Sequence, residues 1–431
     1  MPTPETITRI HAREVLDSRG QPTVEVEVHC QSGAWGRAIV PSGASTGSHE
    51  ARELRDSGQT RFGGKGVSKA VSNARDIVAP QLLGMPVTDQ TGIDRALREL
   101  DGTPDKSRLG ANAILGVSLA CAHAAAAVRQ VPLWRYVDIE GKPCLPLPMV
   151  NMISGGLHAG GNLDLQDFLL LPIGARSYSE ALEMTVAVYR FLGATLIHHG
   201  FEGYLVGDEG GFGPRLASNE QAIDMILEAI EKAGLTAGKD AAIALDVASS
   251  HFFDQNKYEL KVGGKIQQLS SEEMVELLTG WVKQYPVLSI EDGMAEDDWD
   301  GWQKLTAALG KRVQLIGDDL FVTNPERLQR GIEAGVANSI LIKPNQIGTL
   351  TETLQVIAQA RAAGYRPVIS ARSGETEDTT IADLAMGTGA GQIKIGSVAR
   401  SERLAKYNQL LRIEEQMGPN APFAGWAPIV S

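Results

Sequence analysis

The sequence predicts an α/β fold in which a closed barrel of strands and helices follows a smaller, mixed N-terminal region. The barrel is predicted from strand–helix units of about 20–45 residues, because such repeats form parallel strands joined by helical crossovers. A barrel is preferred to an open doubly wound sheet since six such units succeed one another with no GxGxxG after the first strand. The length of 431 residues suits two domains, or one large barrel with an extension.

The N-terminal region predicts a hairpin followed by helices. Apolar and polar residues alternate over residues 22–40 on both sides of Ser32-Gly33, which is typical of two strands joined by a turn. Helical patterns then continue to about residue 130. The proline-rich residues 142–148 indicate a linker or a domain boundary.

Each unit of the predicted barrel carries its own start and stop signals. Ser218 and Ser270 each precede a glutamine or glutamate by three residues, which is the pattern of a capping box, and Gly234 suits the end of the first helix. A last helix is expected over about 401–417. Strands are predicted at 241–247, 287–290, 313–317, 339–343, 366–370 and 392–395.

Charged residues end these six predicted strands. In order along the chain they are Asp246, Glu291, Asp318, Lys343, Arg372 and Lys394. The C-terminal ends of barrel strands meet at one mouth, where active sites are built. One charge after an apolar run often marks only the end of a strand, but three acids followed by three bases indicate a site.

The types of these residues predict a particular chemistry. Three carboxylates with no nearby Cys or His are hard oxygen ligands, which suit Mg²⁺ or Mn²⁺ rather than zinc. Lys343 and Lys394 could neutralise an anion, or one of them could lose its proton and act as a base, because burial and nearby positive charge lower a lysine pKa. A carboxylate substrate on the metal would have its α-proton acidified.

Composition excludes several other classes of protein. With 40 basic and 52 acidic residues the net charge is −12, which disfavours nucleic acid as the main partner. Three cysteines without a CxxC pair predict no disulfide framework and a cytoplasmic location. Residues 109–128 carry no acid, Lys or Arg and could span a bilayer, but they are mostly small and include Asn112, so we expect a buried helix and no membrane partner.

Five segments resemble the enolase (phosphopyruvate hydratase) family, and the resemblance extends over essentially the whole chain. It implies a smaller α+β capping domain at 1–140, an α/β barrel domain at 141–431, and a homodimer or a larger homo-oligomer. The segments are EVLDSRGQPTVE at 14–25, VPSGASTG at 40–47, LGANAILGVS at 109–118, ILIKPNQIGT at 340–349 and RSGETED at 372–378.

The resemblance also implies roles for individual residues. Lys343 would remove the α-proton of the substrate, and Glu209 would help hydroxide to leave. The implied ligands of a first Mg²⁺ are Asp246, Glu291 and Asp318, and Ser45 would bind a second, substrate-dependent Mg²⁺. The residues expected to bind the substrate or close over it are His158, Gln166, Asp167, Arg372, Ser373 and Lys394.

Two positions depart from the family pattern inside the expected site. Ala371 stands where enolases carry a histidine, and Asp167 stands where they carry a glutamate. Loss of the imidazole removes a donor and opens space, while the shorter acid retracts charge, and a small misplacement can cost orders of magnitude in rate. The predicted metal ligands and Lys343 are unchanged.

Three functions are compatible with this pattern. The first is an enolase that dehydrates 2-phospho-D-glycerate to phosphoenolpyruvate. The second is a paralogue with altered specificity at the phospho end, such as carboxyphosphonoenolpyruvate synthase in phosphonate natural-product biosynthesis. The third is a non-catalytic enolase-like binding protein, because a fold alone does not establish an activity. For the enzymes, the expected partner is a small anionic phospho-carboxylate.

Overall fold

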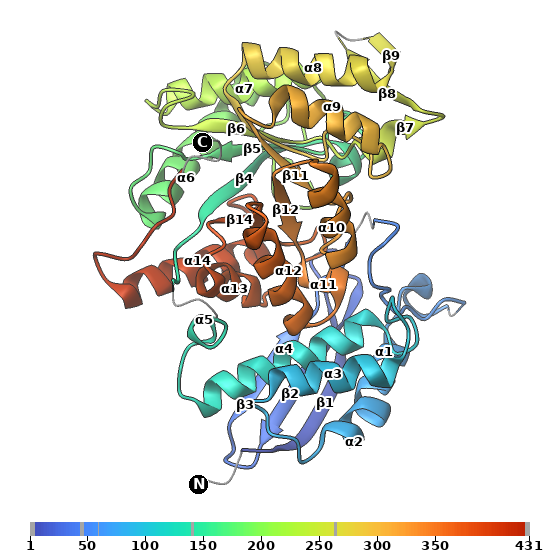
Figure 1. The fold of residues 1–431 in the computed structure, drawn as a ribbon. Coiled ribbons are helices and arrows are strands. Elements are labelled where there is room, and N and C mark those ends of the chain that lie inside the picture. The colour runs from blue at the N-terminus through green and yellow to red at the C-terminus, as the bar shows by residue number, and fades with distance from the viewer. Residues whose placement is uncertain (1–4, 44–46, 59, 139–141, 263–264, 427–431) are drawn as a thin grey trace.

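The chain forms a smaller N-terminal unit and a larger barrel, at the bottom and the top of Figure 1. The computed structural model describes residues 5–43, 47–58, 60–138, 142–262 and 265–426. The closed barrel of mixed α/β structure and the small N-terminal unit confirm the predicted fold class. The domain boundary predicted at residue 140 lies outside the described residues.

A three-stranded antiparallel sheet forms the base of the N-terminal unit. Its strands are β1 (Ile7–Leu16), β2 (Pro22–Cys30) and β3 (Trp35–Ile39). The hairpin predicted over residues 22–40 is therefore confirmed. The first strand was not predicted, because its buried residues do not alternate regularly with exposed ones and its register shifts near Ile7.

Helix α4 (Ala111–Val128) lies against this sheet (Figure 1), and its sequence consists mostly of small residues. Gly36 of β3 lies so close that an added Cβ would be 2.2 Å from the backbone nitrogen of Ala124. By length and composition α4 could cross a membrane, but 83% of it is buried inside the protein, as the sequence predicted. The other helices of this unit are η1 (Arg61–Gly64), α1 (Ser68–Ser72), η2 (Asn73–Val78), α2 (Ala79–Leu82), α3 (Gln90–Asp101) and α5 (Leu133–Tyr136).

Eight strands close the barrel in the order β10-β11-β12-β13-β14-β4-β5-β6. All neighbouring pairs are parallel except the two that involve β5. The six predicted strands, β6 and β10 to β14, are parallel as expected, whereas antiparallel β5 was not predicted. The connection from β4 to β5 contains only a short 3-10 turn, η3 (Gly156–Ala159), and no crossover helix, so the chain returns antiparallel. The strands are β4 (Leu147–Ser154), β5 (Asp167–Leu171), β6 (Ala242–Asp246), β10 (Val287–Glu291), β11 (Gln314–Gly317), β12 (Ser339–Ile342), β13 (Arg366–Ser370) and β14 (Gln392–Gly396).

The helices of the barrel begin where the capping residues predicted. Ser270 and Glu273 form a complete capping box at the start of α8. Ser218 accepts the backbone N–H of Gln221, but the Gln221 side chain accepts from Ala217, so this box is only half formed. The helices are α6 (Tyr178–His198), α7 (Asn219–Lys232), α8 (Ser271–Gln284), α9 (Trp299–Leu309), α10 (Pro325–Ala334), α11 (Pro344–Ile347), α12 (Leu350–Ala362), α13 (Thr380–Thr388) and α14 (Ser401–Met417).

Apolar side chains from most of the strands fill the barrel interior. Polar and charged side chains lie at the C-terminal ends of the strands. This inner cluster consists of Leu147, Met149, Leu169, Leu171, Ala242, Ala244, Ile316, Leu341 and Val368. A small meander, which the sequence did not predict, lies between β6 and α8 and contains η4 (Ser249–Phe252), β7 (Phe253–Asp254), β8 (Lys257–Val262) and β9 (Lys265–Leu269).

Candidate active site

The strand-end charges meet at the C-terminal mouth of the barrel. Asp246 and Glu291 are the last residues of β6 and β10 and lie opposite each other in the parallel register. Asp318 and Lys343 directly follow β11 and β12. The mouth contains a small cavity lined by Gly43, Glu50, His158, Gln166, Glu209, Asp246, Asp319, Lys343, Ser370, Ala371, Arg372, Ser373 and Lys394.

Two lysines pair with the three acids predicted to bind metal. Lys394 Nζ lies 2.7 Å from Asp246 Oδ2 and 2.7 Å from Glu291 Oε2. Lys343 Nζ lies 2.5 Å from Asp318 Oδ2. Because the three acids and Lys394 are buried and Lys343 is nearly so, each ammonium offsets the charge of carboxylates that would otherwise repel one another.

The three carboxylates suit a hard divalent cation. Glu291 Oε1 is buried and has no hydrogen-bond partner among the described residues, although its other oxygen binds Lys394. Burial and the negative charge of Asp246 raise the pKa of Glu291 to about 8, which reflects a shortage of positive charge around it. An all-oxygen donor set with a vacant lone pair fits Mg²⁺, the ion suggested by the sequence.

Acidic residues that directly follow β10 and β11 form a second group next to the predicted metal ligands. Asp292, Asp318 and Asp319 offer oxygens that all lie within 4.8 Å of one another. Asp292 accepts the backbone N–H groups of Asp318 and Asp319 at 2.9 and 2.8 Å, which fixes the loop that carries Asp318. The sequence analysis assigned no role to Asp292 or Asp319; the doubled acids at 291–292 and 318–319 were the available signal.

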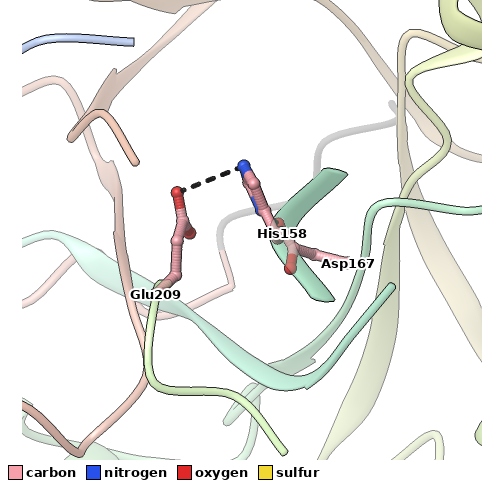
Figure 2. A group of neighbouring side chains, drawn as sticks. All are labelled: His158, Asp167 and Glu209. Carbon is pink, nitrogen blue, oxygen red and sulfur yellow. Dashed lines mark hydrogen bonds and ion pairs between the residues drawn. The ribbon is translucent and has the colours of Figure 1, made fainter. Parts of the chain in front are cut away.

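His158 lies between two carboxylates on the opposite wall (Figure 2). Its Nδ1 is 2.8 Å from Asp167 Oδ2, and its Nε2 is 4.0 Å from Glu209 Oε1. Burial lowers the pKa of His158, but the charges of Asp167 and Glu209 outweigh burial and raise it to about 9. Burial also raises the pKa of Asp167 to about 6, so between these values the pair is an imidazolium and a carboxylate.

Antiparallel β5 brings Gln166 and Asp167 to this mouth. Asp167 is the first residue of β5 and lies opposite Asp246, which ends β6. Gln166 Nε2 donates to Asp246 Oδ2 at 3.1 Å, so Gln166 contacts a predicted metal ligand directly. Asn151, which the sequence analysis did not select, donates to Asp167 and orients it toward His158.

Arg372 pairs with an acid from the N-terminal unit. Its guanidinium binds both oxygens of Glu50 at 2.9 and 3.2 Å and also donates to Asn345 Oδ1 at 3.0 Å. Neither Glu50 nor Asn345 was predicted, because no periodicity or spacing connects them with Arg372. Ser373 is buried beside Arg372 and lines the same cavity. Ser45, predicted to bind a second metal, lies outside the described residues.

Ala371 forms part of the cavity wall between Ser370 and Arg372. Its side chain is buried, and its backbone N–H donates to the carbonyl of Lys394 at 2.8 Å. The departure from the family pattern noted at this position therefore alters the shape of the cavity itself. A methyl group here leaves room that an imidazole would fill.

Comparison with known families covers both parts of the chain. Residues 7–137 match the family described as "Enolase, N-terminal domain", and residues 142–430 match "Enolase, C-terminal TIM barrel domain". Members of this family generally use Mg²⁺, which agrees with the buried acidic residues at the mouth. With nearly its whole length matched and a closed barrel whose charged strand ends share one mouth, the chain belongs to the enolase family.

Proposed function

We propose that the protein is a Mg²⁺-dependent carbon–oxygen lyase that converts 2-phospho-D-glycerate to phosphoenolpyruvate and water. The observation that carries this proposal is the cavity shared by Lys343, Glu209, Arg372, Lys394 and Asp246. A base, an acid, two fixed cations and a metal ligand are the groups that such an elimination needs. These groups line one small cavity at the mouth of the barrel, so a bound substrate could contact all of them.

The first step is removal of the α-proton by Lys343. In the ligand-free site burial lowers the pKa of Lys343, but the charge of Asp318 outweighs burial and raises it, so the amine carries a proton. When Asp318 serves as a metal ligand, its charge no longer favours the ammonium. Burial and the positive charges of Arg372 and Lys394 then favour the neutral amine that a base must be.

The second step is loss of the β-hydroxyl group with a proton from Glu209. A carbon–carbon double bond forms as the carbon–oxygen bond breaks, and the hydroxyl leaves as water. Burial raises the pKa of Glu209, but His158, Arg403, Lys394 and other cations outweigh burial and lower it. A substrate with several negative charges would offset these cations and favour the protonated acid.

The remaining groups bind and orient the substrate. Lys394 would face the substrate carboxylate, and Arg372 with Ser373 would bind its phosphate, because a guanidinium forms paired hydrogen bonds with phosphate oxygens. Asp246, Glu291 and Asp318 would hold Mg²⁺, which when bound stabilises the negative charge that develops on the substrate carboxylate. We place a second, substrate-dependent Mg²⁺ at Ser45.

The experiment is an absorbance assay for the enol product with 2-phosphoglycerate and Mg²⁺. Turnover that stops on chelation with EDTA and returns with added Mg²⁺ is the expected result. Lack of turnover by folded, Mg²⁺-loaded protein would reject the proposed substrate.

A second candidate function follows from Ala371. The space beside this methyl group could admit a larger phosphorus substituent, as in a carboxyphosphonoenolpyruvate synthase. That candidate predicts a feeble rate with 2-phosphoglycerate that Ala371→His raises by at least about tenfold, because a misplaced or missing group at a reacting centre costs rates of this order. An ordinary enolase rate in the unmodified protein would exclude it, and a phosphonate-bearing acid should be assayed in parallel.

We also propose that the enzyme is a cytoplasmic homodimer or larger homo-oligomer without nucleic-acid or membrane partners. Its family supports the assembly, and the excess of acidic residues supports the absence of a nucleic-acid partner. Light scattering coupled to size-exclusion chromatography tests the assembly, and a mass of a single 46.1 kDa chain would contradict it.

A further inference from the structure

Arg403 is a buried charge to which the proposed reaction assigns only an electrostatic effect on Glu209. It lies in α14, outside the cavity, and its side chain has no exposed surface. The nearest carboxylate recorded beside it belongs to Glu402, with Oε1 3.6 Å from Arg403 Nε. A guanidinium removed from water needs compensating partners, so the groups that it contacts indicate its purpose.

Those partners are backbone carbonyls from three separate segments of the mouth. Arg403 Nη1 donates to the carbonyl of Arg372 at 2.6 Å and to that of Ile395 at 3.0 Å. Arg403 Nη2 donates to the carbonyl of Ser373 at 2.6 Å and to that of Asp208 at 3.5 Å. One planar group therefore joins the loop before Glu209, the anion-binding residues after β13, and the end of β14.

Neighbouring contacts make this junction rigid. The backbone N–H of Ser397 donates to the carbonyl of Glu209 at 2.8 Å, and the hydroxyl of Tyr407 donates to the carbonyl of Gly396 at 2.7 Å. An added Cβ at Gly396, whose φ is +118°, would lie 2.8 Å from the Glu209 carbonyl and 2.9 Å from Arg403 Cδ. The segments are therefore packed too closely to shift independently.

A second cation of α14 holds the same anion-binding segment. Lys406 Nζ, also buried, lies 2.7 Å from Glu375 Oε2. Glu375 Oε1 accepts the backbone N–H of Arg372 at 3.1 Å. Lys406 thus reaches this one segment, through the Glu375 carboxylate and the Thr376 carbonyl, whereas Arg403 joins three segments.

We propose that Arg403 is a positioning residue that sets the distance between the acid Glu209 and the anion-binding pair Arg372 and Ser373. The inference rests on the proposed function for what these residues do, but its geometry does not depend on the substrate. A guanidinium is required because two nitrogens in one plane must each bridge two carbonyls, which a lysine ammonium at a single point cannot do.

The test compares Arg403→Ala and Arg403→Lys with the wild type and with Arg412→Ala, which removes an exposed arginine of the same helix. In the 2-phosphoglycerate assay both Arg403 variants should lose about 100-fold in kcat/KM, since a misplacement of about 1 Å can cost that much. Arg412→Ala should retain wild-type values. Added ethylguanidinium should restore at least about tenfold of the loss in Arg403→Ala and none in Arg403→Lys, where the amine fills the space.

Hydrogen–deuterium exchange gives a readout that needs no substrate. In Arg403→Ala, exchange should be faster in residues 208–211, 372–376 and 396–398, and unchanged in β6. Wild-type kinetics in a folded Arg403→Ala, wild-type exchange in the three segments, or failure of both Arg403 variants to fold would each overturn the proposal. Lack of turnover in the wild type would instead reject the proposed function, and the exchange result would still decide the role of Arg403.

Discussion

Each predicted metal ligand accepts a hydrogen bond from a buried or nearly buried lysine. Asp318 accepts from Lys343 with one oxygen and from Gln346 Nε2 at 3.1 Å with the other, so it connects the proposed base with the metal site. Glu291 keeps one buried oxygen without a partner among the described residues. At Glu291 a divalent ion could therefore bind through the oxygen that Lys394 leaves free.

We expect Asp318→Asn to abolish Mg²⁺-dependent turnover while the fold remains intact. The amide keeps the shape of the side chain but removes the negative charge that binds the cation, and a loss of more than about 100-fold is expected. Calorimetric titration with Mg²⁺ and the enol absorbance assay measure the two effects. Asp300→Asn, an exposed change on α9, is the matched control, and full activity in Asp318→Asn would refute the metal assignment.

The ion pair of His158 and Asp167 predicts a pH dependence of stability. The pKa of His158 is raised to about 9 in the folded protein, so its contribution is fully present below its unfolded value near 6.5 and is lost as the pH rises through 9. The difference in unfolding free energy between the wild type and His158→Gln should fall between pH 6.5 and 9.5, by on the order of 1–3 kcal/mol.

Urea unfolding at both pH values measures this effect. His199→Gln is the control, because the His199–Glu228 pair is partly exposed and solvent screens it. A difference for His158→Gln that is the same at both pH values would show that the ion pair does not form.

The roles of single residues were only partly predictable from the sequence. The six strand-end charges were found because each follows an apolar run, a signal contained within a few residues. Glu50, Asn151 and Arg403 carried no such signal, since each acts on a partner distant in the chain. In α14, Arg403 occupies a buried position that sequence periodicity would assign to an apolar residue.

At the scale of elements, the close packing of α4 on the sheet explains its composition of small residues. We expect Gly36→Ala to destabilise the protein by about 1–3 kcal/mol, because the new Cβ would be 2.2 Å from the Ala124 nitrogen and 2.5 Å from the Ala120 oxygen. Gly280→Ala is the control: Gly280 is exposed in α8 with no atom within 4 Å of the new Cβ, and alanine there should stabilise by about 0.5–1 kcal/mol.

Urea denaturation of both variants measures these changes in unfolding free energy. The dependence of the unfolding free energy on urea concentration should be the same as in the wild type. Equal stabilities of Gly36→Ala and the wild type would mean that α4 can move away from β3 without cost.

The elements were predicted well where local signals define them. The predicted bounds of the strands with charged ends, and the predicted starts of the helices with serine caps, agree with the structure to within one or two residues. The last helix has the predicted bounds. Strands β4 and β5 were not predicted, because residues 142–148 read as a linker and β5 follows no helix. The direction of β5 depends on which strands it meets on closure of the barrel, and periodicity contains no such information.

At the scale of the whole molecule, the N-terminal unit completes the cap of a barrel helix, α12, whose own N-cap residue is Thr349. The first backbone N–H groups of α12 donate to Ser118 Oγ at 3.0 Å and to Asp94 Oδ2 at 2.8 Å. Lys106, buried in the same unit, lies 3.1 Å from Glu352 in the first turn of α12. The two parts are thereby joined beneath the site, where Glu50 also reaches Arg372.

We expect Asp94→Ala to weaken this junction by about 1–3 kcal/mol, because it leaves buried donors of α12 without an acceptor. Differential scanning calorimetry should show a lower Tm, and the KM for 2-phosphoglycerate should rise as the Glu50–Arg372 contact loosens. Asp76→Ala is the control, since it removes an exposed acid of η2 in the same unit, and its Tm should match that of the wild type. An unchanged Tm in Asp94→Ala would contradict this account of the junction.

The sequence by itself determined the fold class, the order of the predicted strands and helices, and the charged residues at the strand ends. These properties depend on residues that are close together in the sequence, because periodicity, helix caps and strand ends are all local signals. Only the tertiary structure decided that β5 runs antiparallel, that Lys394 bridges Asp246 and Glu291, and that Arg403 joins three segments. Such contacts link residues up to hundreds of positions apart, and they exist only once the barrel has closed and excluded water from its mouth.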